Sequence, residues 1–143
     1  MTENSGPRHG GAPASRGRTT IADVVVEKIA GMAARDVPGV YALGSGFARS
    51  MGSMRERMPG AGSGKSATRG VSVEVGQREA AIDLEIVVDY GVSITDVAGA
   101  VRESVISAVE RMAGREVVEV NITVSDVKLP DEEDEEEERQ QIR

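Results

Sequence analysis

A change of hydrophobic period within residues 71–127 constrains the fold more than any other feature of the chain. Apolar and polar residues alternate through 71–75 and 82–88, and again through 118–124, whereas the residues between the last two segments have the 3.6-residue period of a helix. Alternation with a period of two is typical of a strand that buries one face. The pattern therefore predicts a β-hairpin, a helix and a returning strand, in a sheet covered on one side only.

The predicted helix between these strands has recognisable ends. Ser93 and Asp96 have the spacing of a capping box, in which each side chain satisfies a backbone amide of the first turn. Gly114 is a typical C-terminal stop, because glycine readily adopts the left-handed conformation needed there. The predicted buried stripe recurs at 100° per residue and consists of Ile94, Val97, Ala98, Val101, Val105, Ala108, Val109 and Met112.

A second helix is predicted upstream, opening at Thr20. Thr20 and Asp23 repeat the capping-box spacing, and Pro38 pushes the residue before it out of the helical region. The buried stripe of this helix is predicted to consist of Ile21, Val25, Ile29 and Met32, widened by Val24, Val26 and Ala33. The chain order is then α-β-β-α-β. We predict an α+β fold, a two-layer sandwich in which two helices cover one face of a three-stranded mixed sheet.

Four pieces of the chain occur in a distinctive order and spacing: IADVVVEKIAGMAARDVPGV, VSVEVG, AAIDLEIVVDYGVSI and AVERMAGREVVEVNITVSDV. With them the chain resembles the alkaline shock protein family, the envelope stress response proteins of Gram-positive bacteria. No single piece is a catalytic signature. Thr95 stands where the family often has a proline, and either residue suits the first turn of a helix.

Composition divides the chain into three parts. Residues 1–18 are rich in Gly, Pro, Ser and Arg, and residues 129–143 contain a run of consecutive acids, so we predict a disordered N-terminal arm and a disordered acidic tail. Residues 19–128 are predicted to form the alkaline-shock-like domain, with a flexible basic insert at 44–70. The alternative for this insert is a short amphipathic helix around Phe47–Met58 that becomes ordered on contact with a partner.

The candidate chemical motifs are weak. Gly60–Ser66 ends in Gly-Lys-Ser, but Pro59 stands where a phosphate-binding loop needs glycine, and the flanking strand and helix are missing. His9 is the only histidine, and the absence of cysteine excludes thiolate catalysis and cysteine-ligated metals. Acids that share one strand face are more often a solvated surface than a cation site. Those acids are Asp83, Glu85 and Asp89. We therefore predict no enzyme, and no catalytic, cofactor-binding or metal-binding residues.

The family resemblance implies a non-enzymatic stress response protein that acts as a self-associating scaffold at the cytoplasmic face of the membrane. The implied partners are further copies of the chain or related family members, together with a membrane-anchored protein. The sequence has no secretory signal and no run of about 18 apolar residues, so we expect a cytoplasmic chain that reaches the membrane only through a partner.

An RNA-binding, KH-like module that uses the basic insert is the alternative function. A KH module has a GxxG loop between two helices, and readers of single strands stack bases on aromatic side chains. Neither feature is present in this sequence, and aromatic residues make up only 2% of it. We therefore expect no nucleic acid among the partners.

Self-association is expected to use a sheet edge or the outer face of the sheet. A three-stranded sheet has two edges, whose unpaired amides and carbonyls can accept a strand from another chain. Four apolar residues are predicted to point away from the core and to contribute to such a contact. They are Val87, Ile106, Val117 and Val127.

Overall fold

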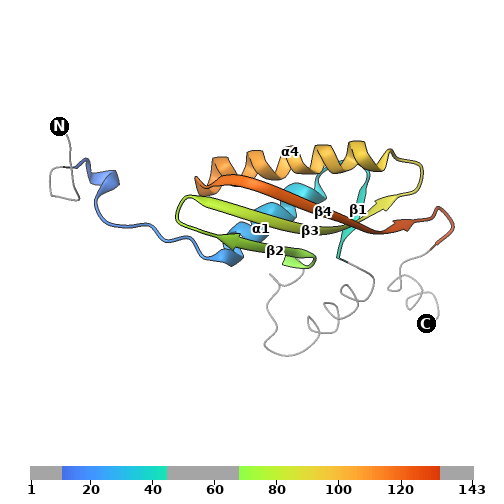
Figure 1. The fold of residues 1–143 in the computed structure, drawn as a ribbon, viewed down its shortest axis with the longest axis horizontal. Coiled ribbons are helices and arrows are strands. Elements are labelled where there is room, and N and C mark those ends of the chain that lie inside the picture. Colours follow the sequence, from blue (N-terminus) through green and yellow to red (C-terminus); the bar gives the residue numbers. More distant parts are fainter. Residues whose placement is uncertain (1–10, 45–67, 133–143) are drawn as a thin grey trace, which may run out of the picture.

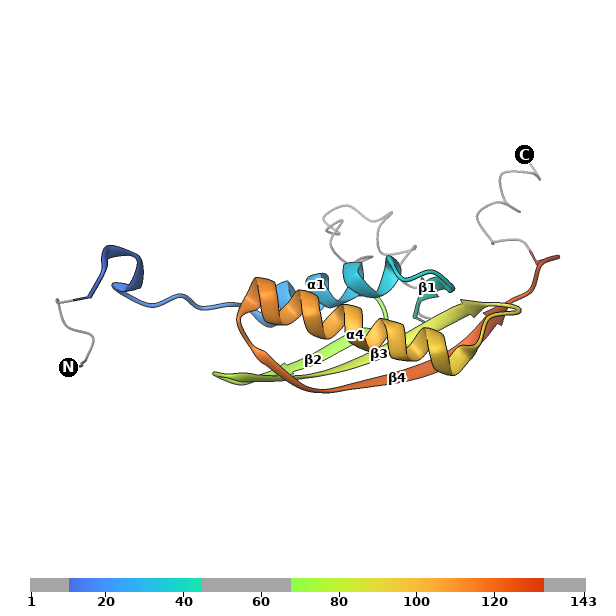
Figure 2. The same cartoon turned by 90° about the horizontal axis from the view of Figure 1, so that it is seen from above.

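The computed structural model describes residues 11–44 and 68–132. Figures 1 and 2 show a two-layer arrangement, with both long helices on one face of a single sheet. The elements in chain order are the short 3-10 helix η2 (Pro13–Ser15), α1 (Asp23–Arg35), β1 (Val40–Leu43), β2 (Val71–Val75), β3 (Glu79–Asp89), α4 (Ile94–Ala113) and β4 (Glu116–Lys128). The predicted α+β class and the predicted helix layer are confirmed.

The sheet has four strands, so the prediction of three was wrong. The additional strand is β1, which pairs with β3 only between Val40 and Leu43 and contains a register shift. A strand this short carries too few residues to display an alternating pattern, which explains why the sequence did not reveal it. The order of the main elements is therefore α-β-β-β-α-β.

β3 lies at the centre of the sheet. β1 and β2 are both antiparallel to β3, and β4 is parallel to it along the whole length of β3. Because β4 occupies one side of β3, β1 and β2 must share the other side. β2 pairs with residues 80–84 of β3 and β1 pairs with residues 86–88, so the two short strands lie in line along one side of β3.

Glu85 marks the point where β1 and β2 meet. Its carbonyl accepts a hydrogen bond from Gly44 N at 2.6 Å, and its amide donates to Gly70 O at 2.8 Å. Gly44 and Gly70 therefore lie beside one another, and the chain between them leaves and rejoins the sheet at a single place. The prediction of a flexible insert falls mainly on residues 45–67, which lie outside the described residues, as do the first ten residues and those after 132.

The core fills the space between the sheet and the two helices. Alternate residues of β3 are almost completely buried, from Ile82 to Val88, as their period predicted. α4 contributes four buried valines to this core, whereas α1 contributes mainly small residues, which allow its backbone to approach closely. The buried residues of the two helices are Val26, Ala30, Gly31 and Ala34 on α1 and Val97, Val101, Val105, Val109 and Ala113 on α4.

The helix boundaries are close to those expected, but the capping details differ. α4 begins after Ser93, and Gly114 ends it with φ of 67°, as predicted. Neither helix has a side-chain hydrogen bond at its N-cap, and the N-cap of α1 is Ala22, so neither predicted capping box is formed.

The buried face of α1 is rotated from the predicted stripe. Val25 is 43% exposed and Met32 is 52% exposed, whereas Ala30 and Ala34 are fully buried. α1 packs against both the sheet and α4, and small residues suit this double contact better than large ones. On α4, Met112 is also largely exposed.

Two β-bulges change the alternation along β4. The register with β3 skips Val118 and Ser125, so each bulge inserts one extra residue. Val118 is consequently exposed, although strict alternation predicted it to face the core. The core-facing residues of β4 are Val117, Val120, Ile122, Val124 and Val127.

Candidate interaction surfaces

The four apolar residues predicted to point outward do not form a contact surface. Val117 is buried in the core, and Val127 and Ile106 pack against it while partly buried. Val87 is only 2% exposed. The predicted surface was therefore wrong, and for the two residues on β4 the cause is the pair of bulges, because a bulge moves the following residues to the other face.

α4 caps the first part of the free edge of β4. The Glu110 carboxylate accepts a hydrogen bond from Val117 N at 3.0 Å. Arg102 Nε donates to the Val120 carbonyl at 3.1 Å. These two side chains occupy backbone groups that would otherwise be available to a further strand.

Beyond Val120 the edge of β4 is open. The Val120 carbonyl points away from β3, and alternation along the strand places the backbone groups of Ile122 and Val124 on the same side. No hydrogen bond between described residues reaches them there. At Val127 the amide is occupied by the neighbouring Asp126 side chain, at 2.8 Å.

β2 provides a second open edge on the opposite side of the sheet. Gly70 O and Gly76 N bond toward β3, so the backbone groups of the intervening odd-numbered residues point outward. Those residues are Val71, Val73 and Val75, and their side chains face the core while partly buried. Within the described part of the chain, no hydrogen bond covers this edge. Among the described residues, backbone groups on both edges of the sheet are thus left without a hydrogen-bond partner.

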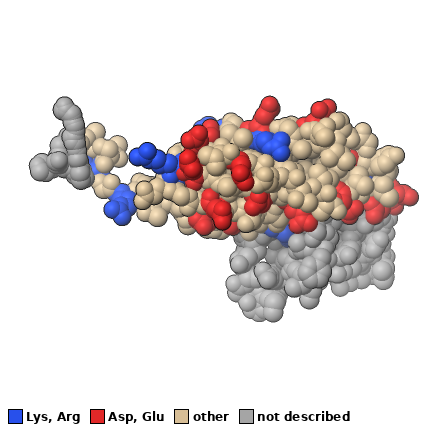
Figure 3. All heavy atoms as spheres, in the orientation of Figure 1, with Lys and Arg blue, Asp and Glu red and all other residues tan. Residues whose placement is uncertain are grey.

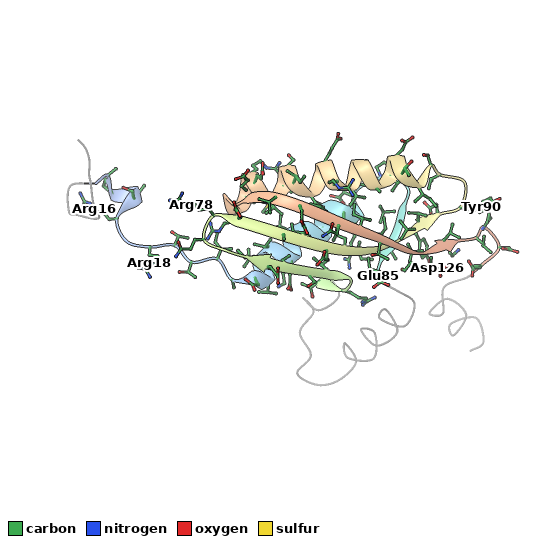
Figure 4. All side chains as sticks on the ribbon, in the orientation of Figure 1. Arg16, Arg18, Arg78, Glu85, Tyr90 and Asp126 are labelled. Atoms are coloured by element: carbon green, nitrogen blue, oxygen red, sulfur yellow. The ribbon has the colours of Figure 1, made fainter. Side chains whose placement is uncertain are left out.

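The outer face of the sheet is acidic. Figure 3 shows Asp and Glu side chains spread over the sheet, and Figure 4 places Glu85 and Asp126 on this side of the molecule. Asn121 Nδ2 donates to Asp83 Oδ1 at 3.0 Å and to Glu119 Oε2 at 2.7 Å, so it bridges β3 and β4 across this face. Among the described residues, no three His, Cys, Asp or Glu side chains are grouped so that they could hold a metal ion.

A groove of about 510 Å³ lies between α1 and α4, on the helix face. Ile29 and Ala33 of α1 and Ala108 of α4 supply apolar lining, and Met32 and Met112 line it as well. The Ser104 hydroxyl donates to the Ala33 carbonyl at 3.1 Å and links the two helices. Sequence reasoning missed this groove because it assigned both methionines to the buried stripes. The exposure of these methionines indicates the groove, but it could be recognised only after the structure had shown which face of each helix is buried.

A family model matches residues 11–129, which include every helix and strand described above. It is the model of the Asp23 family, described by a cell envelope-related function (the number is part of the family's name). The chain belongs to the Asp23 family. The resemblance to alkaline shock proteins drawn from the sequence is thereby confirmed.

Two kinds of relatives of this Asp23-family chain are similar over most of its length. A protein of Streptococcus pyogenes serotype M3, named a stress response regulator gls24 homolog, is 33% identical over 119 residues, which is 83% of this chain and 63% of that protein. The uncharacterized protein YqhY of Bacillus subtilis is 34% identical over 113 residues, which is 79% of this chain and 78% of that protein. No solved structure matches the chain.

The remaining described candidates of the Asp23-family chain, three carboxylates of β3, do not form a metal site. Asp83 and Glu85 lie on the acidic outer face, and Asp89 is the last residue of β3. Gly60–Ser66 and His9 lie outside the described residues. Within the described part, no helix is both long enough and apolar enough to cross a membrane.

Proposed function

We propose that the chain is a non-enzymatic stress response protein that self-associates into a scaffold at the cytoplasmic face of the membrane, where a membrane-anchored partner holds it. The family's cell envelope-related function supports the location at the envelope. The name of the streptococcal relatives, stress response regulators, supports the physiological role. The chain spans 63% of the length of those relatives, so the proposed role concerns only the domain that they share.

The observation that carries the proposal is the pair of open edges on opposite sides of one sheet. A single open edge would allow only a closed dimer, whereas two different edges allow each copy to bind one copy on either side. In our proposal the β2 edge of one copy pairs with the β4 edge of the next. Since β2 is antiparallel and β4 parallel to β3, copies in the same orientation would pair these edges antiparallel, the pattern that sheets favour overall.

Disulfide trapping tests this arrangement directly, because the chain contains no cysteine of its own. Thr123 on β4 and Ser72 on β2 are exposed and lie on the outer face beside the two edges. Opposite residues in an antiparallel pair have Cα atoms about 4.5–5.5 Å apart, within the range of a disulfide. We expect T123C combined with S72C to give a ladder of covalent multimers on oxidation. If the two strands are shifted by two residues, Glu74 lies opposite Thr123 instead of Ser72. T123C combined with E74C tests that register.

Controls separate the proposed pairing from other contacts. Each single-cysteine variant should give at most a weak dimer, and S107C combined with S72C should give no ladder, because exposed Ser107 lies on α4. Strong dimers from T123C alone would instead indicate β4 pairing with β4. A wild-type chain that stays monomeric at high micromolar concentration in light scattering would refute self-association altogether.

No observation favours the RNA-binding alternative. The outer face of the sheet carries carboxylates, which repel a phosphate backbone. The basic insert on which that alternative depends lies mostly outside the described residues.

A further inference from the structure

The groove between α1 and α4 has a shape that suits the binding of a third helix. Figure 2 shows the two helices side by side and running in opposite directions across the sheet. The furrow between two such helices accepts the side-chain ridge of a third helix, with apolar residues spaced at i, i+3, i+4 and i+7. Ile29, Ala33 and Ala108 make the lining apolar, and Met32 and Met112 provide flexible apolar side chains.

The two methionines are the most exposed large apolar residues of the described helices, ahead of Val24, Val25 and Ile94, which do not line the groove. Met32 is 52% exposed and Met112 is 63% exposed, although both line the same groove. Methionine adapts its shape to different partners, and it is over-represented at binding surfaces. Isolated exposed hydrophobic residues need no explanation, but two on facing helices beside an apolar furrow form a continuous surface.

The charges of the groove are separated along its length. Ser104 of α4 bonds Ala33 of α1, so Asp36 lies toward that end. Because the helices are antiparallel, Lys28 and Arg111 lie together at the other end of the groove. Both cations are exposed, and neither has a hydrogen bond or ion pair to another described residue. The basic end is therefore available to an incoming carboxylate.

From these observations we infer that the groove binds an amphipathic helix of a partner protein, which places apolar residues over Met32 and Met112 and an acidic residue against Lys28 and Arg111. This goes beyond the proposed self-association, because it uses the helix layer and leaves both sheet edges free. A scaffold built through the edges would thus display one such groove per copy. The chain's own segment Phe47–Met58 suits the groove poorly, since it carries three arginines against one glutamate.

The probe for this inference is a synthetic helical peptide with leucines at i, i+3 and i+7 and two glutamates at one end. A matched peptide carries lysines in place of the glutamates. Binding is followed through the ε-methyl NMR signals of Met32 and Met112 in the full chain. We expect the acidic peptide to shift both signals. The lysine peptide should bind about tenfold more weakly, because it meets Lys28 and Arg111 with like charge.

Two double variants sharpen the test. M32S combined with M112S should weaken the acidic peptide at least about tenfold, because the exposed anchors are truncated. V24S combined with V118S is the matched control, since these residues are similarly exposed but are not among the residues lining the groove, and should leave its affinity unchanged. K28E combined with R111E should reverse the preference toward the lysine peptide. That reversal is a result that loss of folding cannot produce.

Other occupants of the groove would give distinct results. Methionine signals that move with protein concentration alone would indicate a second copy, and signals that move on deletion of residues 45–67 would indicate the chain's own segment. Equal affinity for the acidic and lysine peptides would indicate unspecific apolar contact. Each of these results overturns the inference. None of them alters the disulfide ladder that T123C and S72C should form through edge pairing. The second-copy result has a further sign of its own, because S107C alone should then form dimers.

Discussion

A Cβ atom added at Gly70 would lie 2.4 Å from Gly44 N and 2.9 Å from Glu85 O, and the φ of Gly70 is +77°. Both contacts are with backbone atoms that the sheet holds in place. We therefore expect G70A to lower the free energy of unfolding by about 3 kcal/mol, because positive φ and a backbone clash act together. Urea denaturation with a circular dichroism readout measures this change.

Gly114 is the matched control for this substitution. Its φ of +67° is similar, but an added Cβ would have no atom within 4 Å. G114A should therefore cost only about 1 kcal/mol, the typical penalty of a side chain in the left-handed conformation. Equal losses for G70A and G114A would mean that the contact with Gly44 does not constrain the sheet.

The buried residues could be predicted for an element that packs against one neighbouring layer. They could not be predicted for a helix that packs against both the sheet and another helix. Ile82, Leu84, Ile86 and Val88 lie on the face of a central strand that meets the helices, and their burial follows from the alternation, whereas that of Val87 does not. Met32 lies on a helix that packs against both the sheet and α4, and close packing there selected Ala30 and Ala34 instead. Hydrophobicity alone cannot indicate that a small residue is preferred to a large one.

The bond pattern of α4 leads to a prediction about the β4 edge. Glu110 and Arg102 occupy Val117 N and Val120 O, so R102A combined with E110A frees both backbone groups. We expect a loss of about 0.5–1.5 kcal/mol for each hydrogen bond and faster amide exchange at Val117. The longer open edge should also increase the oligomer size in light scattering.

The control for the edge variant is E103A, which removes an exposed acid of α4 that has no bond to β4. It should change neither the amide exchange of Val117 nor the oligomer size. If the double variant associates less than the wild type, the capped part of β4 is itself part of the contact and the assignment of the open edge is incorrect.

The long elements could be read from the sequence, and the irregular ones could not. The period of residues 94–112 identified α4, and Gly114 identified its end. The bulges at Val118 and Ser125 left no mark, because neither residue is a glycine or proline. The interaction surfaces depend on these irregular features, and for that reason the predicted contact residues on β4 were wrong although the strand itself was correct.

At the scale of the whole molecule, net charge opposes self-association. The chain carries a formal charge of −7, and the outer face of the sheet is acidic. Raising the salt concentration from 0.1 M to 1 M shortens the screening length from about 10 Å to about 3 Å. We therefore expect larger oligomers at high salt if copies pair through backbone edges, because repulsion between copies is screened.

Light scattering across a salt titration measures this dependence, with sodium chloride as the salt. Oligomers that dissociate as salt rises would show that opposite charges hold the copies together, for example basic segments against the acidic face. Such a result would contradict edge pairing while leaving self-association itself intact. The disulfide ladder formed at both salt concentrations provides an independent check on which edges meet.

The position of β4 at the end of the domain has a consequence for synthesis. β4 supplies the whole of one side of β3, yet it is the last described element to leave the ribosome. Until it docks, the nascent chain presents a bare β3 edge beside core residues that β4 will cover. Such partly formed sheets recruit strands from neighbouring chains. The interval between the emergence of β3 and the docking of β4 is therefore the one in which strands of neighbouring chains can pair wrongly with β3.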